Sequence, residues 1–499
     1  MLHLSWLRHA FGQRCKPVLK SRWFWAVVGV TALGLALRAY HLGHGALWYD
    51  EAFSALAAEQ PFAQMIDATA YDVHPPLYYA ILWAWFRLWP GLGRPSEWWL
   101  RLPSLLFSAL SIPLTWSFAR GFNADRRAAL LAATLMAVLP FQIFYGQETR
   151  QYSLLLLVSL LTVVCWQRRW WSGLCVGLIG CAYTHNLGVI WAGTFGLLIL
   201  INDRENWRHI LWAGFGAGLA YLPWAIRLIV QLSQWGTVGY WLPPVTPGGF
   251  FYAFHALLWN EHTLATIVNP GMILSACLVV LAVVQRPALS ILKQLFIVPP
   301  LVIAVISILV QPIFFSRGLI YITPAFCTLI AVGLFKLPKV PQLTMATVIC
   351  FTLGTSLHSY YHSPTLQKWP HREWANIITQ GWREGDRVLC AAKCLPFIWY
   401  LPQAEIVTLP YVDDHLHCVL SPGTMQAMAV DEIDEIDDLD GSRLWFIFTN
   451  DASTTWYQWS VREQLDAKYP TLFRHTFLTS RIADGEITLY DMETIWTND

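Results

Sequence analysis

The residues best suited to chemistry begin with two adjacent carboxylates, Asp50 and Glu51, in the segment Leu47-Trp-Tyr-Asp-Glu-Ala-Phe-Ser54. They follow the first long apolar run and have aromatic neighbours, so holding them charged at a membrane surface costs free energy. A carboxylate placed there can take a proton from an incoming hydroxyl or bind a hard cation that neutralises a phosphate. The structural alternative is a helix N-terminus, where the helix dipole favours acidic residues.

A second polar segment, Asp72-Val-His-Pro-Pro-Leu-Tyr-Tyr79, follows in the same stretch. Its two prolines fix the backbone ahead of a helix, so Asp72 and His74 project from a rigid corner. His74 can bind a phosphate when protonated or a metal when neutral. A histidine with its hydrogen bonds satisfied at the membrane interface is an equally favoured alternative.

A third segment, Tyr145-Gly-Gln-Glu-Thr-Arg-Gln-Tyr152, is a short connection between two apolar runs. A surface pair between Glu148 and Arg150 would contribute little stability, whereas Glu148 beside the first outer loop would complete a polar cleft. We expect His185 and Arg317 to join that cleft, since arginine is well suited to a buried phosphate. Other arginines at the ends of apolar runs are expected only to snorkel towards the interface: Arg38, Arg101 and Arg227.

The chain carries neither a GxGxxG fingerprint after a strand nor a Walker loop. Those glycine-rich loops are the usual cradle of nucleotide phosphates, so no nucleotide-sugar site or ATPase is indicated. If the chain is a transferase, its donor must already be in the membrane. A lipid-phosphate donor fits acids and arginines that meet at the bilayer surface.

The elements that position these residues must be membrane helices. Of 499 residues, 56% are apolar and 13% are charged, about half the usual charged fraction of ~25%. The 28 Trp, 19 Tyr and 26 Phe are side chains that favour membrane–water interfaces. A soluble enzyme, a nucleic-acid-binding protein and a disordered chain are poor descriptions, and a polytopic α-helical membrane protein is predicted.

A membrane-spanning helix needs about 20 apolar residues, and about 11 runs approach that length, or 12 to 13 if ambiguous stretches are counted. The stretch 75–90 can span or lie flat in the interface as an amphipathic helix. The predicted spans are 24–42, 99–119, 128–145, 152–167, 170–184, 187–202, 210–230, 269–285, 294–311, 318–335 and 341–358.

The positive-inside rule decides how 75–90 is placed. The first 22 residues contain five Lys or Arg and no acid, so the N-terminus is predicted to be cytoplasmic. If 75–90 lies in the interface, 16 of the 23 basic residues before position 360 fall inside, with three of the 11 acids. The loop 43–98, the loop at Glu148, Arg317 and the tail then share the outer face.

Charge divides the chain into three predicted parts: a cytoplasmic N-terminus over 1–23, a hydrophobic domain over 24–358 that includes the first outer loop 43–98, and an acidic domain over 359–499. Residues 1–359 hold 23 basic and 11 acidic side chains, whereas the rest holds 10 and 21. This tail alternates strand-like and helix-like runs, which predicts a small extracytoplasmic α/β domain.

Within the tail, strands are predicted over 387–391, 443–449 and 486–490, and helices over 373–383 and 461–469. The acidic run 431–440 lacks the spacing of an EF-hand loop and is interpreted as a solvated segment. Two of the three tail cysteines can pair if the tail faces an oxidising compartment, and the sequence leaves the choice open: Cys390, Cys394 and Cys418.

Several segments, in order, resemble the GT-C superfamily of polyprenyl-phosphate-sugar glycosyltransferases, in its protein-mannosyltransferase-like and aminoarabinose-transferase-like branch (glycosyltransferase family 39 and relatives). The resemblance covers about residues 24–358, and the tail from Trp369-Pro-His-Arg-Glu-Trp-Ala is similar to the extracytoplasmic domain of that branch. Gly318 stands where relatives often carry an aromatic residue. The segments are Asp50-Glu51, His74-Pro-Pro-Leu-Tyr-Tyr, Leu102-Pro-Ser-Leu, Tyr145–Tyr152, Tyr183-Thr-His-Asn and Phe315-Ser-Arg.

The resemblance implies an inverting transfer from a polyprenyl-phosphate sugar on the outer face of the plasma membrane. Asp50 would be the general base on the acceptor hydroxyl, and Glu51 would support it. The acceptor would be a glycolipid, a polysaccharide or a protein, and a divalent cation is left open, with Glu51 and Glu148 as its ligands. Phosphate or acceptor binding would fall to His74, Glu148, Arg150, Tyr152, His185 and Arg317.

Two functions from other classes compete with this one. A transporter or flippase of lipid-linked sugars would usually show paired repeats and broken helices at the midplane, and no internal repeat is evident. A silent scaffold would not need the Asp50-Glu51 pair. The donor sugar, the acceptor and the oligomeric state are not encoded in any motif.

Overall fold

The structure is a computed structural model of the chain. It describes residues 21–72, 74–234, 242–259, 273–274, 277–278, 280, 284, 290–363, 370–390, 394–402, 404, 406–408, 443–449, 456–479 and 482–492. The predicted span 269–285 lies mostly outside the described residues. Cys418 and the acidic run 431–440 lie wholly outside them.

The chain folds into two compact units, each built from two separate stretches. Residues 1–42 and 101–361 form the first, which we call the membrane unit. Residues 43–100 and 362–499 form the second, which we call the loop–tail unit. The first outer loop therefore folds with the tail, whereas the sequence analysis had grouped it with the hydrophobic domain.

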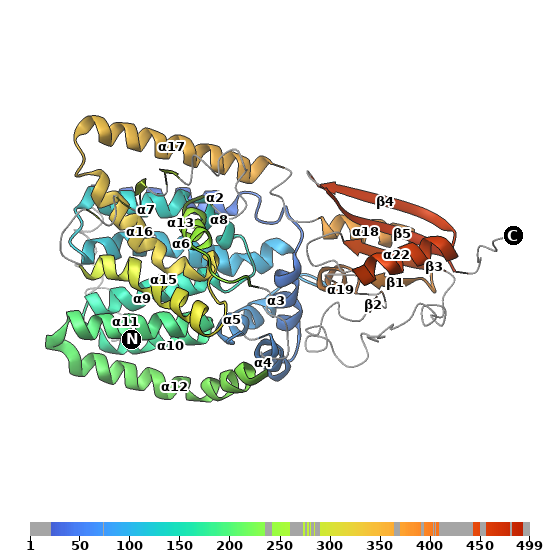
Figure 1. Cartoon of the computed structure of the whole chain (residues 1–499), viewed down its shortest axis with the longest axis horizontal. Coiled ribbons are helices and arrows are strands. Elements are labelled where there is room, and N and C mark those ends of the chain that lie inside the picture. The colour runs from blue at the N-terminus through green and yellow to red at the C-terminus, as the bar shows by residue number, and fades with distance from the viewer. Residues whose placement is uncertain are drawn as a thin grey trace, which may run out of the picture. The chain divides into compact units, whose positions relative to one another are not determined.

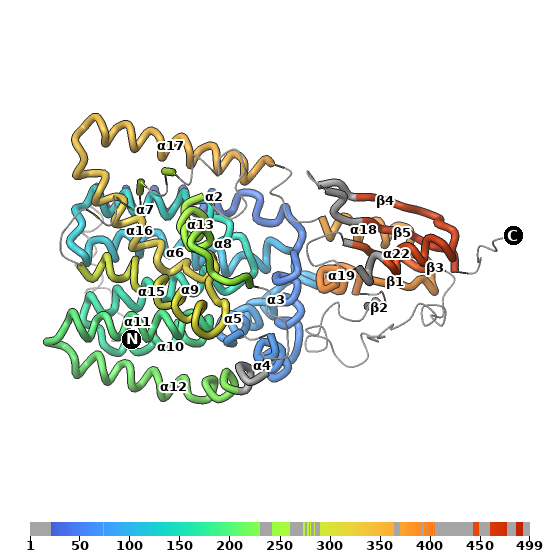
Figure 2. The backbone as a smooth tube through the Cα atoms, viewed as in Figure 1, coloured from blue at the N-terminus to red at the C-terminus, as the bar shows by residue number. Residues whose placement is uncertain are grey.

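The membrane unit consists of helices, whose order along the chain can be followed by colour in Figures 1 and 2. Its helix α6 begins at Glu97, just inside the loop–tail unit. The helices are α2 (Arg22–Ala39), α6 (Glu97–Gly121), α7 (Arg126–Val138), α8 (Pro140–Gly146), α9 (Tyr152–Gln167), α10 (Trp171–Thr184), α11 (Asn186–Asn202), η1 (Arg204–Asn206), α12 (Trp207–Gln234), α13 (Pro247–Trp259), α15 (Ile291–Leu309), η2 (Ser316–Ile322), α16 (Thr323–Leu334) and α17 (Lys339–His362).

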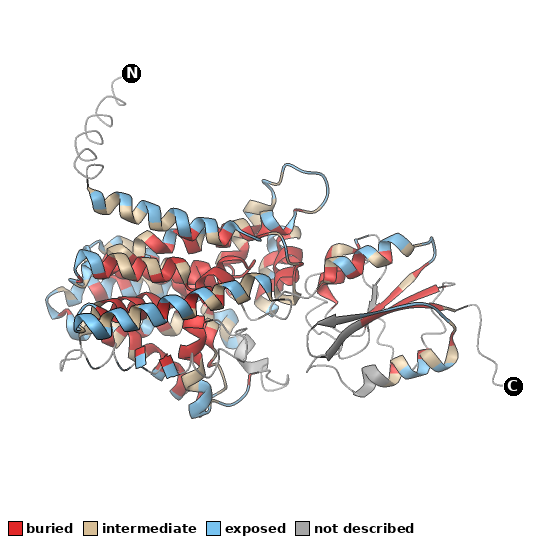
Figure 3. Ribbon diagram, turned by 90° about the horizontal axis from the view of Figure 1, so that it is seen from above, coloured by how far each residue is buried: buried red, intermediate tan, exposed pale blue. Residues whose placement is uncertain are grey.

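Each predicted span other than 269–285 coincides with helix in the structure, which confirms a polytopic helical membrane protein. Among the described residues, five helices are long and apolar enough to cross a membrane, or up to seven if each bent pair is one span. The helices α9 and α10 are apolar but shorter, with 16 and 14 residues. Figure 3 shows buried residues in the interior of this unit and exposed ones along its outer helices.

Two bends interrupt the helices of the membrane unit. Helices α7 and α8 meet at an angle of 55° around Leu139, because Pro140 lacks the N–H that would continue the α7 hydrogen-bond ladder. Helices α11 and α12 meet at 106° across the short η1 turn. The first bend leads into the polar segment 147–151, so it helps to position that part of the predicted site.

In the loop–tail unit, the first outer loop forms three short helices that pack on one another: α3 (Tyr49–Glu59), α4 (Phe62–Tyr71) and α5 (Leu77–Phe86). The rings of Phe53 on α3 and Tyr79 on α5 meet edge to face at 6.1 Å. Helix α5 has 10 residues, about 15 Å of length, half of the ~30 Å hydrocarbon core. It is too short to cross a membrane, which supports the interfacial interpretation of 75–90.

The tail contributes a five-stranded sheet in the order β2-β1-β3-β5-β4. Strand β1 pairs in parallel with β2 and β3, whereas β5 pairs antiparallel with β3 and β4. The three predicted strands correspond to β1, β3 and β5, and two further strands were missed. The strands are β1 (Arg387–Cys390), β2 (Ile406–Thr408), β3 (Arg443–Thr449), β4 (Thr471–Thr479) and β5 (Ile482–Asp491).

Helices cover both faces of the sheet: α18 (His371–Gly381) on one and α22 (Trp456–Lys468) on the other (Figure 3). Gly381 of α18 lies close against the Trp445 ring, and Arg462 of α22 lies over the Phe448 ring. Trp445 and Phe448 are three residues apart on β3, so they face opposite sides of the sheet. This confirms the predicted small α/β domain.

A disulfide joins the sheet to a further short helix, α19 (Leu395–Tyr400). Cys390 ends strand β1 and Cys394 immediately precedes α19, and the two are bonded with their Cα atoms 5.9 Å apart. The sequence left open which tail cysteines pair, and the structure pairs these two. The bond fixes where α19 starts relative to the sheet.

Candidate active site

The two adjacent carboxylates lie in the first turn of α3, where the helix dipole favours negative charge. Their environments differ, because Asp50 is half-buried and Glu51 is fully buried, as are the seven residues after it. Only Asp50 therefore combines a fixed backbone with an approachable carboxylate. Glu51 can act on a substrate only through neighbouring groups.

His74 lies at the junction of α4 and α5, beside the carboxylate of Asp72. Its Nδ1 is 3.0 Å from Asp72 Oδ2, and its backbone N–H donates to the carbonyl of Thr69 at 2.9 Å. Both side chains are about one-fifth exposed. The carboxylate favours a proton on Nδ1 and so orients the ring, with the two prolines directly after it at the start of α5.

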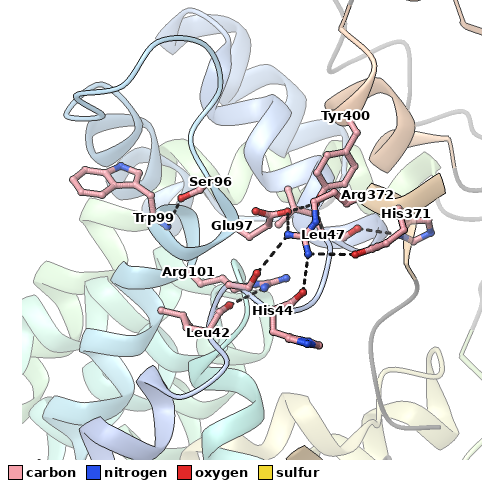
Figure 4. A network of polar contacts seen from close by, with 12 residues as sticks. Leu42, His44, Leu47, Ser96, Glu97, Trp99, Arg101, His371, Arg372 and Tyr400 are labelled. Atoms are coloured by element: carbon pink, nitrogen blue, oxygen red, sulfur yellow. Dashed lines mark hydrogen bonds and ion pairs between the residues drawn. The ribbon is translucent and has the colours of Figure 1, made fainter. Parts of the chain in front are cut away.

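The backbone just before α3 is held by side chains of the tail (Figure 4). The backbone N–H of Leu47 donates to the hydroxyl of Tyr400 at 2.8 Å, and that hydroxyl donates to Glu97 Oε1 at 2.7 Å. The carbonyl of Leu47 lies 3.0 Å from Nδ1 of His371. Both backbone polar groups of Leu47 are thus bonded to the tail, three residues before Asp50.

Two arginine pairs reinforce this arrangement within the loop–tail unit. Arg372 donates to Glu97 at 2.8 Å and to the carbonyl of His44 at 2.9 Å. Arg94 forms a two-pronged pair with Glu59 at 2.9 and 2.8 Å, and also donates to the carbonyls of Ile398 and Trp399 at 2.7 Å. Burial alone would lower the pKa of Arg372, but the charges of Glu97 and Glu373 outweigh it and raise that pKa.

In the membrane unit, the predicted polar segment forms the connection between α8 and α9. Its five residues 147–151 are all buried, with Glu148 at 1% and Arg150 at 3% exposure. Ser104, in the Leu-Pro-Ser-Leu segment of α6, donates to the carbonyl of Arg150 at 3.3 Å. Glu148 and Arg150 are therefore not an exposed surface pair. Charges buried this deeply need compensating contacts.

Gln147, which the sequence analysis did not single out, ties this connection to other helices. Its amide nitrogen donates to the carbonyls of Arg38 and Tyr40 at the end of α2, at 2.9 and 2.7 Å. The hydroxyl of Tyr360 on α17 donates to its amide oxygen. One side chain therefore links three helices at the start of the polar segment.

Three predicted site residues meet in the membrane unit around aromatic rings. The rings of Tyr152 and His185 lie 5.8 Å apart, and the guanidinium of Arg317 lies 5.7 Å from the Tyr152 ring centre. Phe315 joins them, 5.5 Å from Arg317. A Cβ at Gly318 would come 2.3 Å from Leu187 Cδ1 and 3.0 Å from the Phe315 ring, so those side chains would have to shift to admit an aromatic residue at 318.

His185 lies between α10 and α11 and caps the start of α11. Its Nδ1 accepts the backbone N–H of Leu187 at 3.0 Å. A ring nitrogen that accepts cannot carry a proton, so the neutral ring bears its proton on Nε2. His185 thus has a structural role on one side and can offer a donor on the other.

The expectation that Arg38 and Arg101 snorkel is wrong. Arg38 is 0% exposed and Arg101 is 2% exposed, whereas Arg227 is exposed. Arg38 donates to the carbonyls of Met136 and Ala137, both at 2.9 Å. These are orphan carbonyls at the end of α7, where the bend at Pro140 removes their usual donors.

Three of the predicted residues, Asp50, Glu51 and His74, belong to the loop–tail unit, whereas the other predicted residues belong to the membrane unit. Among the residues that the structure describes, no group of three or more His, Cys, Asp or Glu side chains is arranged to hold a metal ion. Metal binding by Glu51 and Glu148 stays a prediction.

No family model and no curated protein matches the chain. Solved structures do. ArnT from Cupriavidus metallidurans in the apo state aligns with a TM-score of 0.61 and 13% identity, over 93% of this chain and 97% of that one. The same protein bound to undecaprenyl phosphate aligns with a TM-score of 0.57 and 14% identity, over 94% and 98%.

This chain has the ArnT fold. The alignment covers 93% of the chain, so it runs through both units. It confirms the predicted fold class, a polytopic helical membrane protein with a C-terminal α/β domain.

Proposed function

We propose that this protein is an inverting glycosyltransferase that moves a sugar from a polyprenyl-phosphate donor to an acceptor hydroxyl at the outer face of the plasma membrane. The observation that carries the proposal is Asp50, a half-buried carboxylate on a rigid helix, in a chain that has the fold of ArnT along nearly its whole length. The ArnT structure with undecaprenyl phosphate supports a lipid-phosphate ligand for this fold.

The chemistry assigned to Asp50 is general-base catalysis. Its carboxylate takes the proton of the acceptor hydroxyl, whose oxygen attacks the anomeric carbon of the donor as the bond from that carbon to the phosphate oxygen breaks. A single displacement inverts the anomeric configuration. The lipid phosphate leaves with the bonding electrons and is itself a good leaving group, so the protein mainly has to position the reactants and stabilise charge.

We assign stabilisation of the phosphate to Arg317 and His185. Arg317 is half-buried, so its guanidinium can form charge-assisted hydrogen bonds to an anion. His185 supplies a neutral Nε2–H donor in the same cluster of rings. The Tyr152 ring lies near both, and Glu148 and Arg150 hold the neighbouring connection. His74, paired with Asp72, is assigned to the acceptor side with Asp50.

The outer-face placement is supported by the loop–tail unit. Residues 43–100 and 362–499 form one compact unit, which supports their placement on one side of the membrane, with an even number of crossings between them. The ten predicted spans between residues 99 and 358 satisfy this condition. The Cys390–Cys394 disulfide supports an oxidising compartment for that side.

The proposal is tested with the full-length protein in membranes. A panel of radiolabelled polyprenyl-phosphate sugars is incubated with membrane lipid extract and with the natural protein or Asp50→Asn. The amide cannot act as a base, so we expect transfer to fall by 10²-fold or more while protein abundance stays unchanged. The donor that labels a product names the sugar.

The matched control is Asp67→Asn, because Asp67 is an exposed acid on α4 in the same loop. We expect it to transfer like the natural protein. Normal transfer by Asp50→Asn would refute the role of Asp50. Donor movement across vesicles without any transfer, by the natural protein, would replace the transferase with a flippase.

A further inference from the structure

The helix that carries Asp50 begins without a cap of its own. Helix α3 starts at Tyr49, and its N-cap residue, Trp48, makes no side-chain capping hydrogen bond. Helices usually fix their first turn through a side chain that accepts backbone N–H groups. The direction in which α3 leaves its preceding segment must therefore be set by other contacts.

Tail side chains supply those contacts at Leu47. Its N–H is bonded to Tyr400 at the end of α19, and its carbonyl to His371 at the start of α18. The carbonyl oxygen can only accept, so Nδ1 of His371 donates. The two bonds hold Leu47 on both sides and fix the rotation of the backbone that enters α3.

Tyr400 is itself fixed in place. Its hydroxyl donates to Glu97 Oε1 at 2.7 Å, and Arg372 donates to the same oxygen at 2.8 Å. The start of α19 is joined to strand β1 by the Cys390–Cys394 disulfide. The Tyr400 hydroxyl, which accepts the Leu47 N–H, is therefore held by a second hydrogen bond, and its helix is linked covalently to the tail sheet.

We propose that Tyr400 and His371 are positioning residues, through which the tail sets the placement of Asp50. The inference rests on the proposed base role of Asp50. A displacement of about 1 Å at a reacting group can cost 10²-fold in rate. The tail would thereby be required for the correct position of the base in the proposed reaction.

The first test is Tyr400→Phe in the full-length protein, which removes the hydroxyl and keeps the ring. We expect kcat to fall at least tenfold, with the KM for the polyprenyl-phosphate sugar unchanged, because the positioned base is disturbed and the donor site is not. Tyr490→Phe is the matched control: its hydroxyl donates to Asp466 at 2.6 Å inside the tail, away from Leu47. That variant should keep both constants.

A second pair of variants separates positioning from packing at His371. His371→Asn keeps a donor near the place of Nδ1, whereas His371→Leu fills the space without one. We expect the Asn variant to retain most of the kcat and the Leu variant to lose it, with similar unfolding temperatures. Equal kcat values for the two would overturn the role of this hydrogen bond.

Hydrogen exchange of the peptide 47–54 gives a readout that needs no activity. Tyr400→Phe should exchange faster there than the natural protein, and Tyr490→Phe should not. Unchanged exchange and unchanged kcat would overturn the positioning role. If the natural protein transfers no sugar, the proposed function fails, and faster exchange in Tyr400→Phe would still show that the tail holds α3.

Discussion

The guanidinium of Arg38 on α2 donates to the backbone carbonyl of Ala137, 99 positions later on α7, at 2.9 Å. The same side chain donates to Ser108 Oγ on α6 at 2.7 Å. Arg38 therefore joins three helices at the point where α7 ends. Since Gln147 bonds to the carbonyl of Arg38, this junction also anchors the polar segment of the candidate site.

Replacing Arg38 should destabilise the membrane unit. In Arg38→Met the carbonyls of Met136 and Ala137 stay buried and lose this donor, at about 1–3 kcal/mol for each group left unsatisfied. We expect a clearly lower unfolding temperature in detergent, followed by tryptophan fluorescence. Arg126→Ala, which removes an exposed arginine at the start of α7, should unfold like the natural protein. Equal stability of the two variants would contradict the bridging role.

Close packing of α2 on α7 gives a second prediction. A Cβ at Gly34 would lie 3.1 Å from Ala137 Cβ and 3.3 Å from its Cα, whereas Gly29 on the same helix has open space. Gly34→Ala should cost about 1–3 kcal/mol through overpacking. Gly29→Ala should be neutral or stabilising by up to about 1 kcal/mol, since alanine favours helix. Thermal unfolding measures the stability of both variants. A Gly34→Ala variant as stable as Gly29→Ala would contradict the prediction.

These contacts show what the sequence could and could not predict. Long apolar runs predicted the helices well, because hydrophobic length is a local property. Whether Arg38 snorkels or bridges depends on the bend at Pro140, which leaves carbonyls without donors, and no local pattern shows that. The short elements 395–400 and 406–408 were missed because they are too brief for periodicity to register.

The roles assigned to the candidate site residues stay predictions, and the contacts that hold these residues in place were not foreseen. His185 and Arg317 were expected to join one polar cleft and Tyr152 was named as a binding residue, and the structure places the three around shared rings. The bond between Leu47 and Tyr400 joins residues 353 positions apart, and no motif at either end signals it. Only the aromatic and polar character of 369–375, which resembled an appended domain, pointed to that region.

The fold of the tail should depend on pH through Asp386. Burial alone would raise the pKa of Asp386, but hydrogen bonds from Arg443, the Arg383 N–H and the Trp445 indole outweigh it and lower that pKa. A carboxyl whose pKa is lower in the folded state stabilises the fold above its unfolded pKa of about 3.9. That contribution is lost as the pH falls from about 4 through the folded pKa.

Asp386→Asn should therefore weaken the tail at neutral pH by about 3–5 kcal/mol, because it leaves buried Arg443 without its partner. The difference from the natural protein should shrink below pH 4. Pulsed hydrogen exchange of the β3 peptide 443–449, after incubation at a series of pH values, measures this. Glu463→Gln, an exposed acid on α22, is the control. A constant difference at all pH values would argue against the ion pair.

Sidedness can be checked by labelling single introduced cysteines in intact cells, in a background where Cys15, Cys175, Cys277, Cys350 and Cys418 are alanine. Leu92→Cys in the first outer loop and Ala467→Cys in the tail occupy exposed positions of one unit. A membrane-impermeant maleimide should label both from outside. Arg204→Cys, in a loop predicted to be cytoplasmic, should need permeabilised cells. Labelling of only one of the first two would contradict the shared unit.

Variants of His185 can separate its role in folding from its role in sugar transfer. Its Nδ1 caps α11 by accepting the Leu187 N–H, and asparagine is a preferred N-cap residue. His185→Asn should therefore fold with nearly the natural unfolding temperature. It should nevertheless transfer sugar at least tenfold more slowly, because it removes the Nε2–H donor that we assign to phosphate binding. His185→Ala should lose about 1 kcal/mol of stability as well. Full activity in His185→Asn would reduce His185 to a helix cap and leave phosphate binding to Arg317.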